Sequence, residues 1–147
     1  MDKLSFSPCT AAADDIIDEA LFFFRANVMF RNFDVRCGAD RILVYLTFYI
    51  QQCLREMEKT DEKQLAERAL YNLAIRKFAV PGEPDWQLGT LFPSPQSRDE
   101  AEKCRSYLKQ CREEVGGRLA ARVFADGAKS KWWMLFSKRK FMGKELR

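Results

Sequence analysis

The sequence of 147 residues contains no histidine, the side chain that serves most often as a general base and as a metal ligand. Histidine-dependent catalytic triads and histidine-ligated metal sites are therefore excluded. The five cysteines include no Cys-x-x-Cys pair, and their odd number does not close a disulfide framework. With no glycine-rich phosphate loop and no activated nucleophile either, we expect a protein that is not an enzyme and that has no cofactor and no metal, in a reducing compartment.

Glycine and proline are also scarce, with seven and five residues, which argues against a β-sandwich or barrel with its frequent turns. No stretch reaches eighteen apolar residues, and the first residues lack the apolar run of a signal peptide, so we expect no transmembrane segment. Hydrophobic residues make up 47% and charged residues 31% of the chain. Together with the cysteine pattern and the missing signal and membrane segments, this balance predicts one soluble, intracellular domain over residues 1–147.

Apolar side chains recur at helical spacing through most of the chain. After a short leader, residues 1–13, the series Ile17, Leu21, Phe24, Val28 predicts a first helix. Residues 39–58 are apolar on all sides, which is typical of a buried helix in the centre of a bundle.

Two N-terminal capping boxes mark later helix starts. The first, at 60–64, opens a helix with Leu65, Ala69, Leu70 and Leu73 on its apolar side. A proline-rich loop covers residues 77–96, and the second box, Ser97 with Glu100, follows it. The second box opens a long helix with one apolar stripe: Cys104, Leu108, Cys111, Val115, Leu119 and Val123. The glycine pair Gly116 and Gly117 is expected to interrupt this helix.

The C-terminal segment, residues 129–147, carries the net positive charge of the chain. It holds seven Lys or Arg and one Glu, a net of +6, whereas the rest of the chain sums to −2. We expect Ser130 to cap a last helix that runs to about Met142. The fold class predicted is therefore all-α, a single domain of about five helices with one central helix surrounded by the others.

The basic segment fits three partners of different classes: an anionic membrane, a calmodulin-like protein or a nucleic acid. However, its apolar and basic side chains do not separate into two faces, which weakens the membrane and nucleic-acid interpretations. A helix held by its own domain on one side and by a protein partner on the other fits better. The alternative is that Trp132 and Trp133 both belong to the core and that the lysines are only solvated.

Two further stretches suggest contact with a partner. The side chains of Phe22, Phe23 and Phe24 spread over several faces of the first helix, together with those of Met29, Phe30 and Phe33, so part of them should remain exposed. The stiff segment at residues 81–86 suits a contact site, although such loops also simply connect helices. The candidate protein-contact residues are Pro81, Gly82, Glu83, Pro84, Trp86, Lys131, Trp132, Trp133, Lys138, Arg139 and Lys140.

Five segments in order along the chain resemble one family. They are DIIDEA at 15–20 with RANVMFRNF at 25–33, ADR at 39–41 with YLTFYI at 45–50, VPGEP at 80–84, YLKQ at 107–110 with RL at 118–119, and SKWW at 130–133 with KRKFM at 138–142. Together they resemble the 21-kDa subunit family, subunit 3, of the actin-related protein 2/3 complex.

This resemblance implies an all-α fold with one helix surrounded by the others, and a non-catalytic role in nucleating branched actin filaments. The implied partners are the other subunits of the actin-related protein 2/3 complex, especially actin-related protein 3, and the actin mother filament. It implies no small-molecule substrate and a location in the cytoplasm and cytoskeleton. A second hypothesis remains: a stand-alone helical module that binds anionic lipid or nucleic acid through its basic C-terminal tail.

Overall fold

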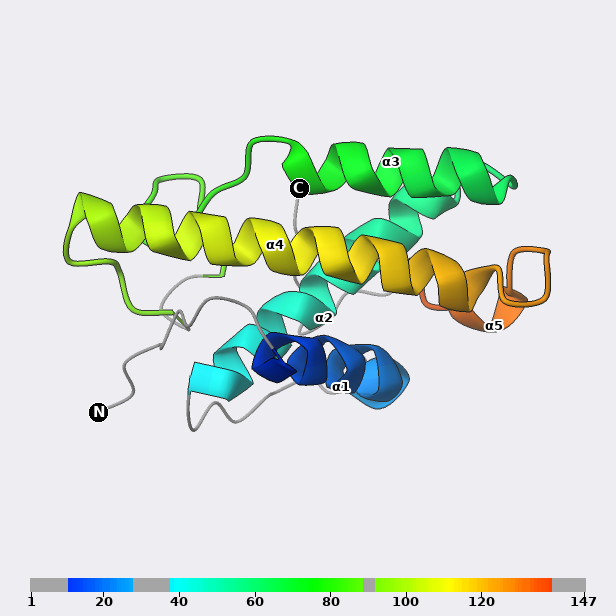
Figure 1. The fold of residues 1–147 in the computed structure, drawn as a ribbon, viewed down its shortest axis with the longest axis horizontal. Coiled ribbons are helices and arrows are strands. Elements are labelled where there is room, and N and C mark those ends of the chain that lie inside the picture. Colours follow the sequence, from blue (N-terminus) through cyan, green and yellow to red (C-terminus); the bar gives the residue numbers. More distant parts are fainter. Residues whose placement is uncertain (1–10, 28–37, 89–91, 139–147) are drawn as a thin grey trace.

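The computed structural model describes residues 11–27, 38–88 and 92–138, and within these ranges the chain is helical with no β-strand (Figure 1). The helices are α1 (Ala11–Asn27), α2 (Gly38–Met57), α3 (Lys63–Ile75), α4 (Arg98–Val123) and α5 (Lys131–Met134). The prediction of an all-α domain is confirmed.

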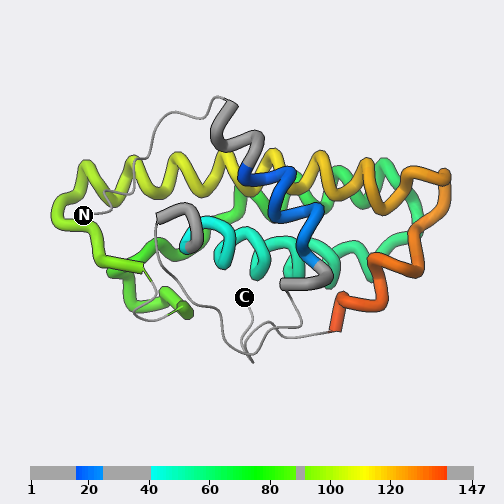
Figure 2. Tube along the Cα trace, turned by 90° about the horizontal axis from the view of Figure 1, so that it is seen from below, coloured from blue at the N-terminus to red at the C-terminus, as the bar shows by residue number. Residues whose placement is uncertain are grey.

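The helix α2 forms the centre of the domain. Helices α3 and α4 run side by side as one layer, α2 crosses behind them, and α1 lies across the lower edge (Figures 1 and 2). Contacts join α2 to α1, α3 and α4. The side chains of α2 are buried almost throughout: Val44, Tyr45, Leu46, Thr47, Phe48, Tyr49, Ile50, Gln51, Gln52, Cys53, Leu54 and Met57. Three of these are polar, namely Thr47, Gln51 and Gln52. The predicted central helix at 39–58 is therefore confirmed.

The helix α1 packs through the face that its periodicity predicts. Ile17, Leu21 and Phe24 are buried, whereas Val28 lies outside the described residues. On the solvent side, Asp18 accepts a hydrogen bond from the Arg118 guanidinium at 3.2 Å, an exposed ion pair between α1 and α4. Burial of the apolar face thus determines how α1 is oriented, because an exposed ion pair contributes about 1 kcal/mol or less.

The helix α3 is rotated relative to the prediction. The expected capping box is wrong: the N-cap is Glu62, which makes no side-chain cap bond, and the Thr60 hydroxyl accepts from the Glu62 backbone N–H at 3.3 Å. Starting at Lys63, the helix buries Ala66, Leu70, Leu73 and Ala74. Leu65, expected on the apolar side, is 47% exposed, because it lies one residue out of the register that faces α4.

The helix α4 begins as predicted. The Ser97 hydroxyl accepts from the Glu100 backbone N–H at 3.1 Å, and the Glu100 carboxylate accepts from the Gln96 N–H at 2.9 Å. Every member of the predicted apolar stripe is buried: Cys104, Leu108, Cys111, Val115, Leu119 and Val123.

The glycine pair does not interrupt α4, contrary to expectation, because the helix runs unbroken through both residues. A Cβ built on Gly116 would stand 3.3 Å from the Leu70 Cβ of α3, closer than ordinary van der Waals contact. Gly117 has nothing within 4 Å of such an atom. Gly116 therefore lets α3 and α4 approach closely, and this packing offsets the low helix propensity of glycine.

The last helix is shorter than the sequence predicts. The helix α5 is a single turn, and residues 135–138 continue as tighter turns in which the Phe136 N–H reaches the Trp133 carbonyl at 3.1 Å. The Ser137 hydroxyl donates to the Met134 carbonyl at 2.9 Å, occupying an acceptor that a longer helix would need. The predicted continuation over 139–142 lies outside the described residues.

Candidate protein-contact surface

The three consecutive phenylalanines of α1 divide between the core and the solvent. Phe24 is fully buried, whereas Phe22 is 71% and Phe23 is 47% exposed. Successive residues on a helix differ by about 100° in direction, so three rings in a row cannot share one face. The expectation that part of these rings remains exposed is confirmed, while Met29, Phe30 and Phe33 lie outside the described residues.

The two tryptophans of α5 divide in the same way. Trp133 is half-buried and stacks on Phe24, with ring centroids 6.0 Å apart, and Phe136 meets the same ring edge-on at 6.2 Å. Trp132 and Leu135, three residues apart, point outward with 59% and 67% exposure. The structure therefore holds α5 through one side and leaves apolar side chains on the other.

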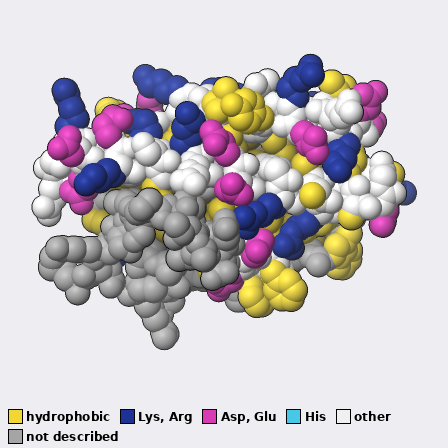
Figure 3. Space-filling view, viewed as in Figure 1, with side chains coloured by type: hydrophobic (Ala, Val, Ile, Leu, Met, Phe, Trp, Pro, Cys, Tyr) yellow, Lys and Arg dark blue, Asp and Glu magenta, His cyan; other side chains and the backbone are white. Residues whose placement is uncertain are grey.

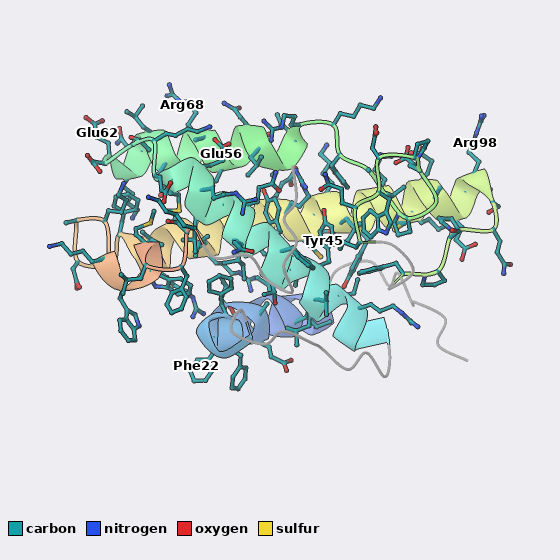
Figure 4. The ribbon with its side chains drawn as sticks, turned by 180° about the vertical axis from the view of Figure 1, so that it is seen from behind. Phe22, Tyr45, Glu56, Glu62, Arg68 and Arg98 are labelled. Carbon is teal, nitrogen blue, oxygen red and sulfur yellow. The ribbon has the colours of Figure 1, made fainter. Side chains whose placement is uncertain are left out.

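Because α5 packs on Phe24, the exposed side chains of α1 and α5 belong to neighbouring parts of the surface. We call Phe22, Phe23, Trp132 and Leu135 the aromatic face. Figure 3 shows hydrophobic side chains at the lower edge of the molecule, by the ends of α1 and α5, and Figure 4 shows Phe22 pointing away from the body. Exposed tryptophan and phenylalanine in one region are typical of protein interfaces.

A lysine at the start of the basic segment holds α5 in place. The Lys129 ammonium donates to the carbonyls of Met57 and Thr60 at 3.1 and 3.0 Å, and it lies 3.0 Å from an Asp61 carboxylate oxygen. The Ser137 hydroxyl bonds the Glu58 carboxylate at the same end of α2. One of the seven basic charges of the segment thus stabilises the C-terminal end of α2, which carries negative partial charge.

The loop at residues 81–86 is attached to the rest of the domain by hydrogen bonds. Pro81 is buried and Pro84 is exposed; Gly82 takes a φ of +92°, which favours glycine. The Glu83 carboxylate accepts from the Val80 N–H at 2.8 Å and from Arg105 at 2.9 Å. The Val80 hydrogen bond, followed by the Arg105 partner, lowers the pKa of Glu83 below its usual value. These bonds link the loop to α4 through Arg105.

Trp86 turns inward from this loop. Its ring stacks parallel to Tyr45 at 6.1 Å and meets Phe92 edge-on at 5.2 Å. A cavity of about 750 Å³ lies beside it, lined in part by Gln52, Phe78 and Arg112. Trp86 therefore serves the packing of the loop onto α2, and a contact role for its ring stays a prediction.

Arg112, which the sequence analysis did not single out, is a cation buried in the interior of the domain. Its guanidinium donates to the Leu73 and Ala74 carbonyls at 2.7 and 3.3 Å and to the Tyr45 hydroxyl at 3.2 Å. It also lies over the ring of Tyr49 at 4.5 Å. Arg112 thus caps the last turn of α3, where carbonyls lack helical partners. The sequence signal is weak: a basic residue beside an apolar stripe is more often exposed.

The candidate residues from the sequence do not form one site. The 81–86 loop packs at the N-terminal end of α4, and residues 131–138 follow its C-terminal end (Figure 1). The loop contacts α4 at Arg105, and at 1.5 Å per residue the stretch from there to the helix end at Val123 spans about 27 Å. Of the basic candidates, Lys131 and Lys138 are exposed, and Arg139 and Lys140 lie outside the described residues.

The described ranges also bear on metal binding, membrane insertion and thiol reactivity. No cluster of three metal-ligating side chains occurs there, and no helix there is long and apolar enough to cross a membrane. Burial raises the pKa of the Cys53 thiol to about 12 and that of Cys104 to about 11, so both thiols are protonated at neutral pH. These cysteines act as small apolar side chains.

Comparison with known proteins gives a consistent result. The model of the P21-Arc family, described as the ARPC3 (21 kDa) subunit of the ARP2/3 complex, matches residues 4–146. A relative from Arabidopsis thaliana named actin-related protein 2/3 complex subunit 3 is 50% identical over 129 residues, which are 87% of this chain and 74% of the relative. Proteins of the same name from Dictyostelium discoideum and Schizosaccharomyces pombe are 48% and 43% identical, over 90% and 95% of this chain and 76% and 80% of their own lengths.

Proposed function

Because this chain belongs to the P21-Arc family, the ARPC3 subunit of the ARP2/3 complex, we propose that it is a non-catalytic structural subunit that supports nucleation of branched actin filaments. In this role it packs against actin-related protein 3, lies near the mother filament and works in the cytoplasm, within the cytoskeleton. Family membership supports the assembly, and the aromatic face supports a role based on contact.

The aromatic face is the surface that we assign to actin-related protein 3. Its exposed rings would be fully desolvated by a neighbouring subunit, and tryptophan and phenylalanine lose little conformational entropy on binding. Because Trp133 and Phe136 are locked against Phe24, the outer side chains are presented on a pre-organised turn. Burial of these rings would stabilise the complex without any chemical step.

The basic segment supports the position near the mother filament. Actin filaments are acidic, and a local net charge of +6 favours approach and orientation toward an acidic surface. Lys129 is already paired with Asp61, so the later basic residues carry this effect. Its strength must fall as salt rises, because exposed charges are screened beyond about 10 Å at 0.1 M ionic strength.

A reconstituted complex tests the subunit contact. Phe22→Glu with Phe23→Glu places two charges on the aromatic face and should abolish co-elution of this chain with actin-related protein 3 in gel filtration. Lys103→Glu with Lys109→Glu, at exposed positions of α4, is the control and should co-elute normally. Normal co-elution of the Phe22–Phe23 variant would remove the aromatic face from this contact.

Branching assays test the filament contact. Glu at Lys138, Arg139 and Lys140 should reduce branch formation at low ionic strength and have less effect at high ionic strength. Unchanged branching at every salt concentration would exclude the basic segment from filament binding. Solitary behaviour of the chain, with binding to anionic vesicles or oligonucleotides, would favour the alternative of a stand-alone module.

A further inference from the structure

Exposed large hydrophobic side chains are not scattered over the described surface. Seven are exposed, and four of them form the aromatic face. The other three are on α3: Leu65, Tyr71 and Ile75, with exposures of 47%, 57% and 45%. Scattered apolar residues need no explanation, but a set confined to one short helix does.

The α3 residues share the outward side of the helix with an arginine. Arg68, Tyr71 and Ile75 follow an i, i+3, i+7 spacing, so their side chains are neighbours on one face. The opposite side of α3 is committed to the core through Ala66 and Leu70. We call Leu65, Arg68, Tyr71 and Ile75 the α3 outer face; Figure 4 shows Arg68 pointing outward from it.

From Arg68 onward the charged side chains of α3 and of the residues that follow it are basic, whereas the exposed Glu67, one turn before Tyr71, lies 4.0 Å from the Lys63 ammonium. Arg68, Arg76 and Lys77 are exposed, and the chain has no acidic residue between Arg68 and Glu83. Neither Arg68 nor Arg76 forms an ion pair within the described part of the chain. Arg76 and Lys77 complement the negative end of the helix dipole, but Arg68 lies in the middle of α3, where this explanation fails.

The α3 outer face and the aromatic face lie on opposite edges of the molecule. In Figure 3 hydrophobic side chains appear at the upper edge over α3 and at the lower edge by α1 and α5, with charged side chains over α4 between them. A partner seated on one face therefore leaves the other open.

We propose that the α3 outer face is a second docking surface, which binds an apolar patch rimmed by carboxylates on a second subunit of the complex. This rests on the proposed function as a subunit held among neighbours. Tyrosine and arginine are the residue types that dominate binding energy at interfaces, and exposed arginines that have no ion-pair partner among the described residues, beside an apolar centre, select an acidic rim. The chain then acts as a bridge between two subunits.

Photo-crosslinking in the reconstituted complex tests the identity of the partner. A benzophenone-bearing residue at position 71 should crosslink to one subunit, and the same residue at position 132 should crosslink to a different one, actin-related protein 3. The proposal would be overturned if position 71 gave no crosslink. It would also be overturned if position 71 crosslinked only to the subunit reached from position 132, only to actin, or only to a second copy of this chain. Failure of the chain to enter the complex, or no crosslink from position 132, would instead refute the proposed function.

Release kinetics test the chemistry of the contact, since interface substitutions act mainly on the dissociation rate. Arg68→Glu with Arg76→Glu should speed release of the labelled chain from the complex about tenfold at 0.1 M ionic strength, and less at 0.5 M. Lys103→Glu with Lys109→Glu makes the same change in net charge on α4 and should not alter the rate. Equal release by both double variants would overturn the proposal.

Discussion

Alanine substitutions at the adjacent tryptophans should separate folding from assembly. Trp133→Ala removes the ring that stacks on Phe24 and leaves a gap beneath α5. Deleting a core aromatic costs about 3–5 kcal/mol, and because Trp133 is half-buried we expect about 2–3 kcal/mol of lost stability. For a domain of this length, that loss lowers the Tm by roughly 4–12 °C.

Trp132→Ala should act on assembly instead. The ring is 59% exposed, so its removal should change the free energy of unfolding by about 0.5 kcal/mol or less. If the ring fills a pocket on a neighbouring subunit, its loss removes about 2 kcal/mol of binding, which weakens the affinity about 30-fold.

Circular dichroism melting of the purified chain measures the first effect, and gel filtration of the reconstituted complex measures the second. Each variant is the matched control of the other, because both remove the same side chain one residue apart. An equal fall in Tm for both variants, or normal assembly of Trp132→Ala, would refute this division of roles.

Three further predictions follow from the interior. Gly117→Ala should raise the free energy of unfolding, measured in urea titrations, by about 0.5–1 kcal/mol. Gly116→Leu should lower the same free energy by more than about 1 kcal/mol, because only the side chain at position 116 meets α3. A loss of stability in both variants would contradict this. Arg112→Met should lower the same free energy by about 2–4 kcal/mol by leaving buried carbonyls unpaired, and Lys109→Met on the exposed side of α4 should change it little. The lowered pKa of Glu83 means that its carboxylate stabilises the fold above its unfolded pKa of about 4.3, and that this contribution is lost as the pH falls through the folded value. Glu83→Gln should therefore flatten the fall in Tm on acidification, and an unchanged pH profile would refute that contribution.

Several elements could be predicted because their signals are local. Residues 39–58 are apolar on every side, and a helix of that kind must be surrounded by other helices. Ser97 and Glu100 satisfy backbone groups within one turn, so the start of α4 needs no tertiary information. The split of the phenylalanines at 22–24 follows from helical geometry alone.

The register of α3, the role of Gly116 and the burial of Arg112 depended on contacts between residues far apart in the chain. Arg112 lies 39 residues from the carbonyl of Leu73 that it caps, and Gly116 is explained only by the closeness of α3. Local periodicity shows which faces of a helix are apolar. It does not show which of two apolar faces, one residue apart in register, will be buried, and for this reason it misplaced Leu65.

By itself, the amino-acid sequence determined that this chain is a helical domain without histidine chemistry, with a central apolar helix and a basic end. Tertiary structure decided which apolar side chains fill the core and which remain for partners. The ring of Trp133 stacks on that of Phe24, whereas Trp132 remains 59% exposed. The physical reason is that the burial of a side chain depends on how all the helices pack together. Once α5 is held against α1 and α2, the adjacent tryptophans therefore have different environments.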